Sequence, residues 1–542
     1  MYLCYNKPAS SDNTGWREQS LPLGNGSIGA RIFGGIQCEM IQFNEKTLFS
    51  GDSEKIGSFQ NLCEMFLNSN TPVPCSENTY LRDLDLETGS AMVACRKGLD
   101  GHTRHYFISA PDNVFAGKIE STGDTLLDFT LSLQSEQNGE ISYDGDCAYI
   151  HGTVNANNGA GKENGEDKNS LEYLFCVKVM ADDGDIAADE SGITVRNTFS
   201  ARIIASCTTS YFSGEELNKA KEYVSAASEK TFPKLFKNHL EDYKRIMGKL
   251  KLNIGQTEEN MTADMLFKAY RKGSKQKETE TLLFEYGKYI LYASSRRESL
   301  PITESGIWNN LNKPENSEIL IDTAKAEKSY RAAYMMNMEE VTTSYESFVL
   351  QHSEEKRYNP FGAFKECVKK TAEKKRSLFG IFNKSCSVQS IGEIIGEAER
   401  LLKNKKEKEA HRLLSESAKM TYSNLLMPDI FDNIAFSECI CKMLVSVDES
   451  GVINILSALP DEWDTGSFGN IITENGFEIG FEWSQHRLKS GTVKSVNGGE
   501  CKIYAHGKFV GISDEDGNDT EEKFENGVIS FYAEKGKTYR MY

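Results

Sequence analysis

The chain has 542 residues, which is too long for a single hydrophobic core, so we expect about two to four domains. With 39% hydrophobic and 26% charged residues, the composition is that of an ordinary globular protein whose buried surface can offset chain entropy. The formal net charge of −18 argues against nucleic acid or an anionic membrane as partner, because both repel an acidic surface. Neutral sugars remain compatible with this charge.

Cysteine and histidine usage gives no sign of a disulfide framework or a metal site. The 13 cysteines are spread widely without CxxC spacing, and the eight histidines do not cluster with them at the spacing of zinc ligands. The opening MYLCYNKPASS lacks a charged n-region and an apolar h-region, and no run of about 18 apolar residues occurs. We therefore expect a reduced, cytoplasmic protein without metal or cofactor.

The stretch from Leu21 to Gly51, LPLGNGSIGARIFGGIQCEMIQFNEKTLFSG, combines six glycines with apolar pieces that resemble strands. The apolar residues supply buried faces, and the glycines supply bends or close backbone contacts. A phosphate-binding loop would need a strand–loop–helix context and a lysine, whereas Gly24-Asn25-Gly26 leads into another strand. The stretch predicts a glycine-rich β meander that opens a large β domain.

Turn signals and hydrophobic periodicity divide the chain into three regions. Residues 1–235 alternate short apolar segments with turns such as Asp144-Gly145, which predicts a large N-terminal β-sandwich. Helical periodicity dominates residues 236–447, and strand patterns return in residues 448–542, which predicts a C-terminal β-sandwich. The polar segment Asn157–Ser170 is expected to be a surface loop.

The expected helices and C-terminal strands follow from these periods. The helices are expected at Ala220–Ser228, Pro233–Leu252, Leu282–Ala293, Thr323–Met338, Glu340–Gln351, Ala363–Arg376, Ile391–Leu402, Lys406–Lys419 and Asn433–Val447. The strands are expected at Ile453–Leu459, Phe477–Trp483, Thr492–Val496, Cys501–Tyr504 and Val528–Tyr532.

Several separated motifs resemble one known family. LPLGNGSIGARIFGG and IQFNEKTLFSG resemble the N-terminal signature of glycoside hydrolase family 95, the α-L-fucosidase family, in which LPLGNGRLGAMVFGG precedes IQLNEDTLWSGG. LLFEYGKYILYASSRRESLPITESGIWNN, at Leu282–Asn310, resembles the first barrel helix of that family and its following loop. Near the end, ILSALPDEWDTGSFGNI and FEIGFEWSQHRLKSGTVKS resemble two further segments. Their order along the chain argues against chance.

The resemblance implies a reaction, a fold and a partner. An inverting glycosidase needs a protonated acid at the leaving oxygen and a base that activates water across the ring. In the family a Glu is the acid, and an Asn polarised by an Asp positions the water at the mouth of an (α/α)6 barrel. The implied reaction is hydrolysis of terminal L-fucose from a fucosylated oligosaccharide or glycan, without metal or cofactor. Family members are often exported, which runs against the cytoplasmic expectation.

The pair of Asn residues that the family places after its GIWN loop has no equivalent here. Counting from Trp308 puts Asp322 at the first Asn and Ala324 at the base, and a methyl group cannot accept a hydrogen bond. No Asn-x-Asn occurs within Ile321–Glu327 at any offset. The acid is equally hard to recognise, because the candidates Glu354 and Glu355 lie in a charged run typical of solvated surface.

Three residues remain as candidates for the site. IFDNI resembles the family's QIDGNFGG with one Gly deleted, which places Asp432 on the Asp that orients the base. An N-cap that satisfies free amides of the following helix is the alternative for Asp432. Trp308 and Asn309 are candidates for substrate binding, since aromatic faces stack on sugar rings, and a core position is the alternative for Trp308.

The length of the helical region predicts a truncated barrel. Twelve helices of about 12 residues with connections of about 5 need roughly 200 residues. Residues 258–447 give 190, and only about eight helices are readable there. Missing helices would expose apolar faces, so the bundle repacks or a second copy covers it in a homo-oligomer. The first functional hypothesis is thus an impaired α-L-fucosidase-type hydrolase, and the second is an inactive relic or glycan-binding scaffold.

Overall fold

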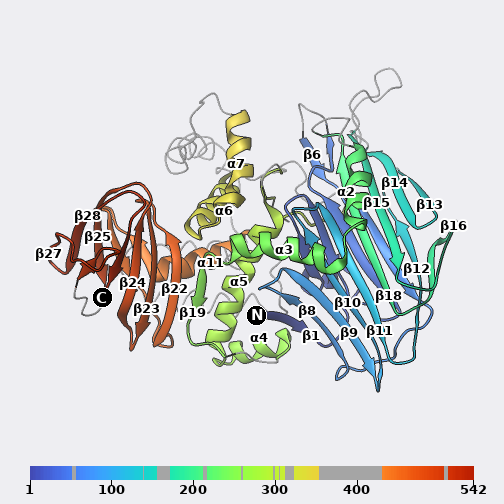
Figure 1. Ribbon diagram of the computed structural model, residues 1–542, viewed down its shortest axis with the longest axis horizontal. Helices are drawn as coiled ribbons and strands as arrows, with labels where there is room; N and C mark the ends of the chain where they lie inside the picture. Colours follow the sequence, from blue (N-terminus) through green and yellow to red (C-terminus); the bar gives the residue numbers. More distant parts are fainter. Residues whose placement is uncertain are drawn as a thin grey trace, which may run out of the picture.

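The computed structural model describes most of the chain in eleven stretches. These are residues 1–51, 56–137, 139–154, 171–211, 217–257, 261–296, 299–303, 306–311, 323–352, 430–505 and 511–542. The chain is multidomain and mostly β-sheet, with a β-sandwich at each end and helices between them (Figure 1). None of the described helices is both long and apolar enough to span a bilayer.

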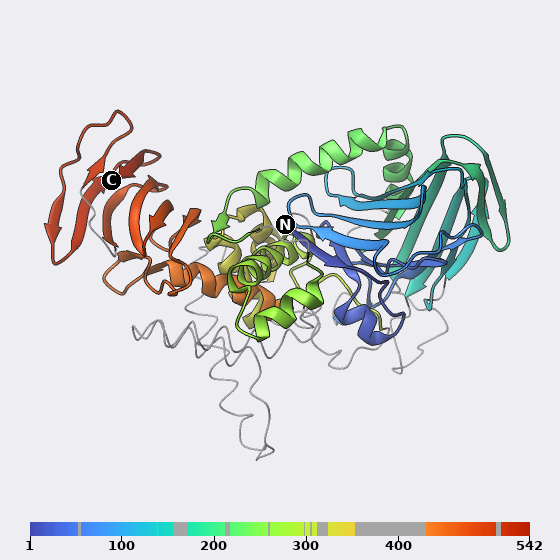
Figure 2. The same ribbon diagram turned by 90° about the horizontal axis from the view of Figure 1, so that it is seen from below.

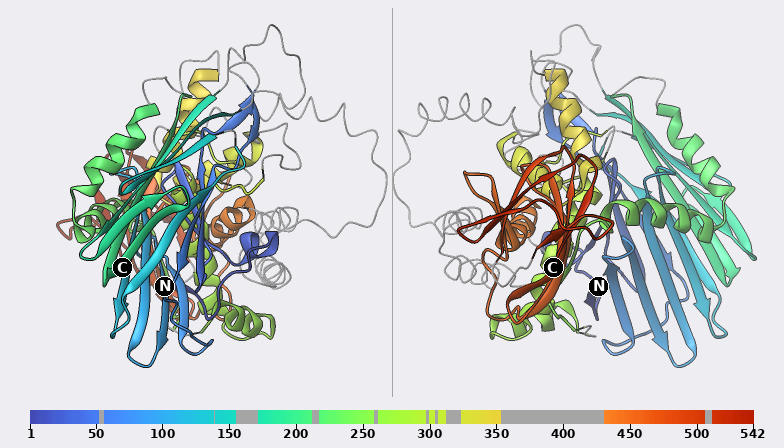
Figure 3. Two further views of the ribbon diagram at one scale, coloured as in Figure 1. Left: turned by 90° about the vertical axis from the view of Figure 1, so that its right-hand side faces the viewer. Right: turned by 60° about the vertical axis from the view of Figure 1, so that its left-hand side comes forward.

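The N-terminal sandwich is built from a nine-stranded and a seven-stranded sheet, stacked face to face (Figure 3). The rings of Phe115 and Phe175 in the first sheet each lie 5.1 Å from the ring of Phe43 in the second. The first sheet runs β1 (Tyr2–Tyr5), β8 (Tyr80–Asp85), β9 (Ser90–Lys97), β10 (Asp100–Ser109), β11 (Val114–Thr122), β18 (Ser200–Thr209), β15 (Leu171–Ala181), β14 (Cys147–Val154) and β13 (Gly139–Asp144). The second runs β16 (Asp185–Asp189), β17 (Gly192–Thr198), β12 (Leu127–Gln134), β7 (Cys63–Ser69), β4 (Cys38–Glu45), β3 (Ile28–Ile32) and β2 (Leu21–Gly24).

Two helices cover the outer face of the nine-stranded sheet. Val224 of α2 (Lys219–Ser228) and Leu235 of α3 (Phe232–Met247) share an apolar cluster with Phe107 and Ile204 of the sheet. Both helices run along one side of the sandwich in Figure 2. A short helix α1 (Asn13–Glu18) and the hairpin of β5 (Phe49–Gly51) and β6 (Ile56–Phe59) complete the N-terminal region.

The described central helices pack around α5 (Gln276–Ser294). Every residue of α5 after Glu278 is buried except Glu285, because the helix lies between the N-terminal sandwich and its helical neighbours. The helices in contact with α5 are α3, α4 (Ala263–Arg271), α6 (Thr323–Met335) and α11 (Ile430–Leu444), and α7 (Glu339–His352) packs on α6. The helices expected at Ala363–Arg376, Ile391–Leu402 and Lys406–Lys419, and the loop expected at Asn157–Ser170, lie outside the described residues.

The C-terminal sandwich recruits a strand from the linker between the first β domain and the helices. β19 (Lys251–Asn253) pairs with β22 (Thr465–Ile472), so the helix expected through Leu252 ends at Met247, just before Gly248. The first sheet runs β19, β22, β23 (Phe477–Ser484), β24 (Arg487–Ser495), β29 (Thr538–Met541) and β26 (Ile512–Ser513). The second runs β20 (Val445–Val447), β21 (Val452–Ile455), β25 (Gly499–Ala505), β28 (Val528–Ala533) and β27 (Lys523–Glu525).

Most of the expected elements are present, with shifted ends. The strands expected at Phe477–Trp483, Cys501–Tyr504 and Val528–Tyr532 lie within β23, β25 and β28. The last helix runs from Ile430 to Leu444 instead of from Asn433 to Val447, because residues 445–447 leave the helix to form β20. The multidomain β-sandwich architecture is therefore confirmed, whereas the truncated (α/α)6 barrel stays a prediction.

We predict that Gly287→Ala destabilises the protein, although alanine ordinarily favours a helix over glycine by about 1 kcal/mol. A Cβ at Gly287 of α5 would lie 2.1 Å from Ser437 Oγ and 2.4 Å from the Asn433 carbonyl oxygen of α11. Thermal unfolding should show a Tm several degrees lower, since overpacking costs about 1–3 kcal/mol. Gly469→Ala is the control, because its added methyl would meet nothing within 4 Å. An unchanged or higher Tm for Gly287→Ala would contradict the close helix crossing.

Candidate active site

The loop that follows α5 packs against the β2–β3 hairpin. An added Cβ at Gly24 or Gly29 would come within 2.6 Å or 2.8 Å of the Ile307 side chain, so only glycine admits this loop. The Trp308 indole N–H donates to the Leu23 carbonyl at 2.9 Å, and Trp308 is 1% exposed. The glycines of the opening motif therefore serve close packing against the loop.

Asn309 joins the same loop to β4 through both its backbone and its side chain. Its N–H donates to Asn44 Oδ1 at 3.1 Å, and its carbonyl accepts from Asn44 Nδ2 at 2.8 Å and from Gln42 Nε2 at 3.0 Å. Its side-chain amide donates to the Phe59 carbonyl at 2.7 Å. We call Gln42, Asn44 and Asn309 the seam. It is buried, and it joins the IQFNEKT and GIWNN motifs across about 265 residues of sequence.

Two buried charged residues of β4 and its following turn extend the seam. Lys46 Nζ donates to the carbonyl of Ser294, the last residue of α5, where the helix dipole favours a cation. Glu45 accepts from the Thr47 N–H at 2.7 Å and from its hydroxyl at 2.5 Å. Burial raises the pKa of Glu45 to about 7 and lowers the pKa of Lys46 to about 7. Burial therefore reduces the charge that each of these two side chains carries near neutral pH.

The start of α11 lies beside the loop and so brings Asp432 to it. A Cβ at Gly306 would lie 2.7 Å from Ile430 Cδ1 and 2.9 Å from the Trp308 ring, so the loop and the helix start are in contact. Asp432 is half-buried in the first turn of α11. Lys325 of α6 lies over the Phe431 ring at 5.5 Å, which adds the start of α6 to this region. The start of α11, which carries Asp432, thus touches the loop that carries Trp308 and Asn309.

The structure leaves several predicted positions untested. Asp322, Glu354 and Glu355 lie outside the described residues, and only the backbone of Ala324, in the first turn of α6, is described. The orienting role of Asp432 stays a prediction. Because Trp308 and Asn309 are engaged by protein partners, direct contact of either residue with a sugar also stays a prediction.

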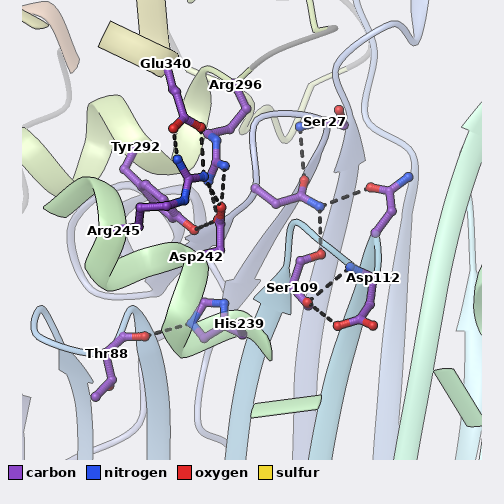
Figure 4. A network of polar contacts seen from close by, with 12 residues as sticks. Ser27, Thr88, Ser109, Asp112, His239, Asp242, Arg245, Tyr292, Arg296 and Glu340 are labelled. Atoms are coloured by element: carbon purple, nitrogen blue, oxygen red, sulfur yellow. Dashed lines mark hydrogen bonds and ion pairs between the residues drawn. The ribbon is translucent and has the colours of Figure 1, made fainter. Parts of the chain in front are cut away.

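A charged network that sequence reasoning missed anchors the other end of the same loop (Figure 4). Arg296 donates from both terminal nitrogens to the carboxylate of Asp242 on α3, at 2.8 Å and 3.0 Å. Arg245 and the Tyr292 hydroxyl also donate to the Asp242 carboxylate, at 2.7 Å and 3.1 Å. Arg245 pairs in addition with Glu340 of α7. Burial alone raises the pKa of Asp242, but these hydrogen bonds outweigh it and lower the pKa. Arg296 lies within the motif LLFEYGKYILYASSRRES, but nothing in the sequence pairs it with Asp242 of an earlier helix.

Asn25, at the centre of the glycine motif, has a structural role. Its Oδ1 accepts from the N–H groups of Ser27 and Ile28, at 3.0 Å and 2.8 Å, which closes the β2–β3 turn. Its Nδ2 donates to Asn113 Oδ1 at 3.1 Å and to the Ser109 carbonyl at 3.3 Å, which ties that turn to the β10–β11 turn.

Among the described residues, no group of three His, Cys, Asp or Glu side chains is arranged to hold a metal ion.

Family profiles match three regions of the chain. The glycosyl hydrolase family 95 catalytic domain matches residues 231–385, and the family 95 C-terminal domain matches residues 448–541. The glycosyl hydrolase family 65 N-terminal domain matches residues 3–57 and 53–214. The resemblance inferred from the sequence motifs is thereby confirmed. Trp308 and Asn309 lie inside the catalytic-domain match, and Asp432 lies between the two family 95 matches.

Individual relatives agree with these profiles. Alpha-L-fucosidase 2 of Arabidopsis thaliana is 24% identical over 54% of this chain and 42% of its own length. Probable alpha-fucosidase A of Aspergillus oryzae is 22% identical over 56% of this chain and 49% of its own length, so the matches span about half of these relatives. A putative kojibiose phosphorylase from the human microbiome shares the fold, with a TM-score of 0.54 at 9% identity over 99% of this chain and 98% of its own.

We predict that Glu45→Gln alters how stability depends on pH. The pKa of Glu45 is raised from 4.5 to about 7 in the folded state. The stability that this shift contributes is therefore fully present below pH 4.5 and is lost as the pH rises to about 7. Glutamine keeps the acceptor for Thr47 but does not ionise. The Tm of the variant minus that of the wild type should therefore become more positive from pH 5 to pH 7. A difference that stays constant or falls over this range would contradict the buried, neutral Glu45.

Proposed function

Because this chain is related to glycoside hydrolase family 95 through its catalytic and C-terminal regions, we propose that it is an inverting, α-L-fucosidase-type hydrolase with impaired activity. Its substrate is terminal L-fucose on an oligosaccharide or glycan. The named fucosidase relatives support the sugar, and the acidic surface is compatible with a neutral substrate.

The observation that carries this proposal is the convergence of the GIWNN loop with the start of α11. The seam fixes the loop on the N-terminal sandwich, and the contact of Gly306 with Ile430 fixes the helix start on the loop. The family resemblance assigns the orienting Asp to Asp432 at that helix start. The positive end of the helix dipole favours a charged carboxylate there, which is the form that can polarise an amide or a water.

Trp308 and Asn309 act in this proposal by holding the wall of the site. The Trp308 ring is 1% exposed and its N–H is used by Leu23, so it supports the surface that faces the sugar. Asn309 is 5% exposed and carries the hydrogen bonds of the seam. A displacement of this loop by about 1 Å would lower the rate roughly 100-fold, because the reacting groups would lose their alignment.

The helical region is proposed to be a truncated (α/α)6-barrel-like domain spanning residues 236–447, between sandwiches at residues 1–235 and 448–542. The packing of α5 against α11, and of α11 against α6, supports helices arranged side by side around a buried centre. A second copy of the chain is the proposed cover for apolar helix faces that missing barrel helices would leave open.

The second candidate function is a glycan-binding scaffold without turnover. It is favoured by the alignment of Ala324 with the base Asn, since alanine cannot activate water. The two candidates differ in outcome, because a scaffold binds a fucosylated disaccharide and leaves it intact.

The test of the proposed activity is incubation of the purified protein with a fucosylated disaccharide, followed by NMR. Slow release of L-fucose with the inverted anomer formed first would support it, and chelator should not change the rate. Release of the retained anomer would overturn the inverting mechanism. Binding without any release of fucose would favour the scaffold instead.

We predict that Asp432→Asn lowers the hydrolysis rate by about 100-fold or more, because loss of a group that assists proton transfer typically costs that much. The Tm should stay within a few degrees of the wild type. Asp264→Asn is the control, since Asp264 also lies in the first turn of a helix, α4. Equal losses of rate and stability at Asp432 would point to a structural role for its carboxylate.

A further inference from the structure

A buried arginine on β3 lies between the rings of two tryptophans. The guanidinium carbon of Arg31 is 4.7 Å from the ring centre of Trp16 on α1 and 5.4 Å from that of Trp308 in the loop after α5. A cation over an aromatic face is attracted by the electrons of the ring, and the attraction is stronger where water is excluded. Arg31 is 8% exposed, and Trp308 is 1% exposed. We call these three side chains the tryptophan stack.

The two ring faces are the main partners of the Arg31 charge. Its Nη1 donates to the Ser20 carbonyl, just after α1, at the long distance of 3.4 Å. Its Nε has no hydrogen-bond partner, and within the described stretches of the chain no carboxylate pairs with the guanidinium. Burial lowers the pKa of Arg31 to about 10, which still leaves the side chain charged at neutral pH. Because a buried cation needs compensating partners, Arg31 favours the arrangement in which both indoles lie against it.

Packing contacts lead from the tryptophan stack to the start of α11. A Cβ at Gly306 would lie 2.9 Å from the Trp308 ring and 2.7 Å from Ile430, the first residue of that helix. Gly306 has a φ of 69°, so its backbone conformation as well as its space suits glycine. Asp432 follows two residues after Ile430, in the first turn of α11. Since no free space separates these groups, a change in the orientation of the Trp308 ring displaces the helix start as well.

The outer ring of the tryptophan stack is itself joined to the same loop. The Trp16 indole N–H donates to Gln42 Oε1, and Gln42 of the seam donates to the Asn309 carbonyl at 3.0 Å. Asn13, at the first turn of α1, accepts from Asn310 Nδ2 at 3.0 Å. The helix α1 and the loop are therefore connected on both sides of Trp308, with Arg31 between them.

We propose that Arg31 is a positioning residue of the hydrolase: through Trp308 and Gly306 it fixes the start of α11, which carries Asp432, relative to the loop. Its effect on the reaction rate rests on the proposed function, whereas its effect on the loop and the helix start does not depend on turnover. The opening stretch has Arg31 where the family motif that it resembles, LPLGNGRLGAMVFGG, has Met. The tryptophan stack is in this respect particular to this chain.

The first test compares hydrogen–deuterium exchange in the full-length wild type and in Arg31→Met, read by mass spectrometry on peptides that cover residues 306–311 and 430–437. Methionine is unbranched and packs well against rings, but it carries no charge to hold them. Exchange in both peptides is expected to be several-fold faster in the variant. Arg31→Lys keeps a cation between the rings and should recover most of the protection. Trp16→Leu, at a half-buried position of α1, removes the outer ring and should show the same pattern more weakly.

The second test measures hydrolysis of a fucosylated disaccharide by the same variants. Arg31→Met is expected to lower kcat by about 10- to 100-fold with little change in KM, because displaced reacting groups slow the chemical step more than they weaken substrate binding. A purely structural role would lower the Tm and leave kcat per folded molecule unchanged. Arg31→Lys should recover part of the lost kcat.

The matched control is Arg202→Met. Arg202 also lies on a strand of the N-terminal sandwich, β18, and its Nη1 donates to the Lys230 carbonyl at 2.9 Å. This variant should keep the wild-type exchange in both peptides and the wild-type kcat. The proposal is overturned if Arg31→Met leaves exchange of residues 430–437 unchanged, or if it leaves the kcat of an active wild type unchanged. If the wild type releases no fucose, the hydrolase function fails, and the exchange data alone decide whether Arg31 holds the loop and the helix start.

Discussion

The arrangement of the region between the two β domains depends on the hydrogen bonds that the buried backbone of the loop after α5 makes with side chains of β4. A buried N–H or carbonyl without a partner costs about 1–3 kcal/mol. The side chain of Asn44 supplies both an acceptor and a donor to Asn309, much as a neighbouring strand would. Gln42 adds a second donor to the same carbonyl. Because the loop is held in this way, the start of α11 that touches it is held as well.

The opening motif and the GIWNN motif are the two halves of one contact. Gly24 and Gly29 leave room for Ile307, and Leu23 accepts from the indole of Trp308. Tyr289 of α5 donates to the Pro22 carbonyl at 2.7 Å, which joins the helix itself to the hairpin. The sandwich thus serves as the template on which the first central helix and its loop are built. This explains why residues so far apart in sequence carry the family resemblance together.

Sequence patterns predicted the elements whose signal is local. The buried face of α5 repeats at helical spacing from Leu282 to Ala293, and Asp144-Gly145 places a turn at the start of β14. The pairing of β19 escaped prediction because a three-residue strand has no period of its own and forms only against β22. α4 was missed because its nine residues make only about two and a half turns, too few for a clear helical period.

The site was predictable in its residues more than in its contacts. Trp308, Asn309 and Asp432 were named from motifs, yet the motifs did not reveal that Trp308 bonds to Leu23 and Asn309 to Asn44, both near the other end of the chain. The ion pair of Arg296 with Asp242 joins the loop after α5 to helix α3, which only the tertiary fold brings together. A single sequence does not show which charged residues form ion pairs, because the spacing of two residues along the chain says little about their distance in the folded protein.

The short strand β19 has a practical implication for dissecting the molecule. An expressed fragment beginning at the first residue of the C-terminal region would lack Lys251–Asn253 and leave the ladder of β22 open on one side. Open strand edges invite pairing with other chains. A usable fragment would therefore carry a grafted copy of that tripeptide or a charged substitute on β22. The linker segment Lys251–Asn253 is therefore part of the C-terminal sandwich.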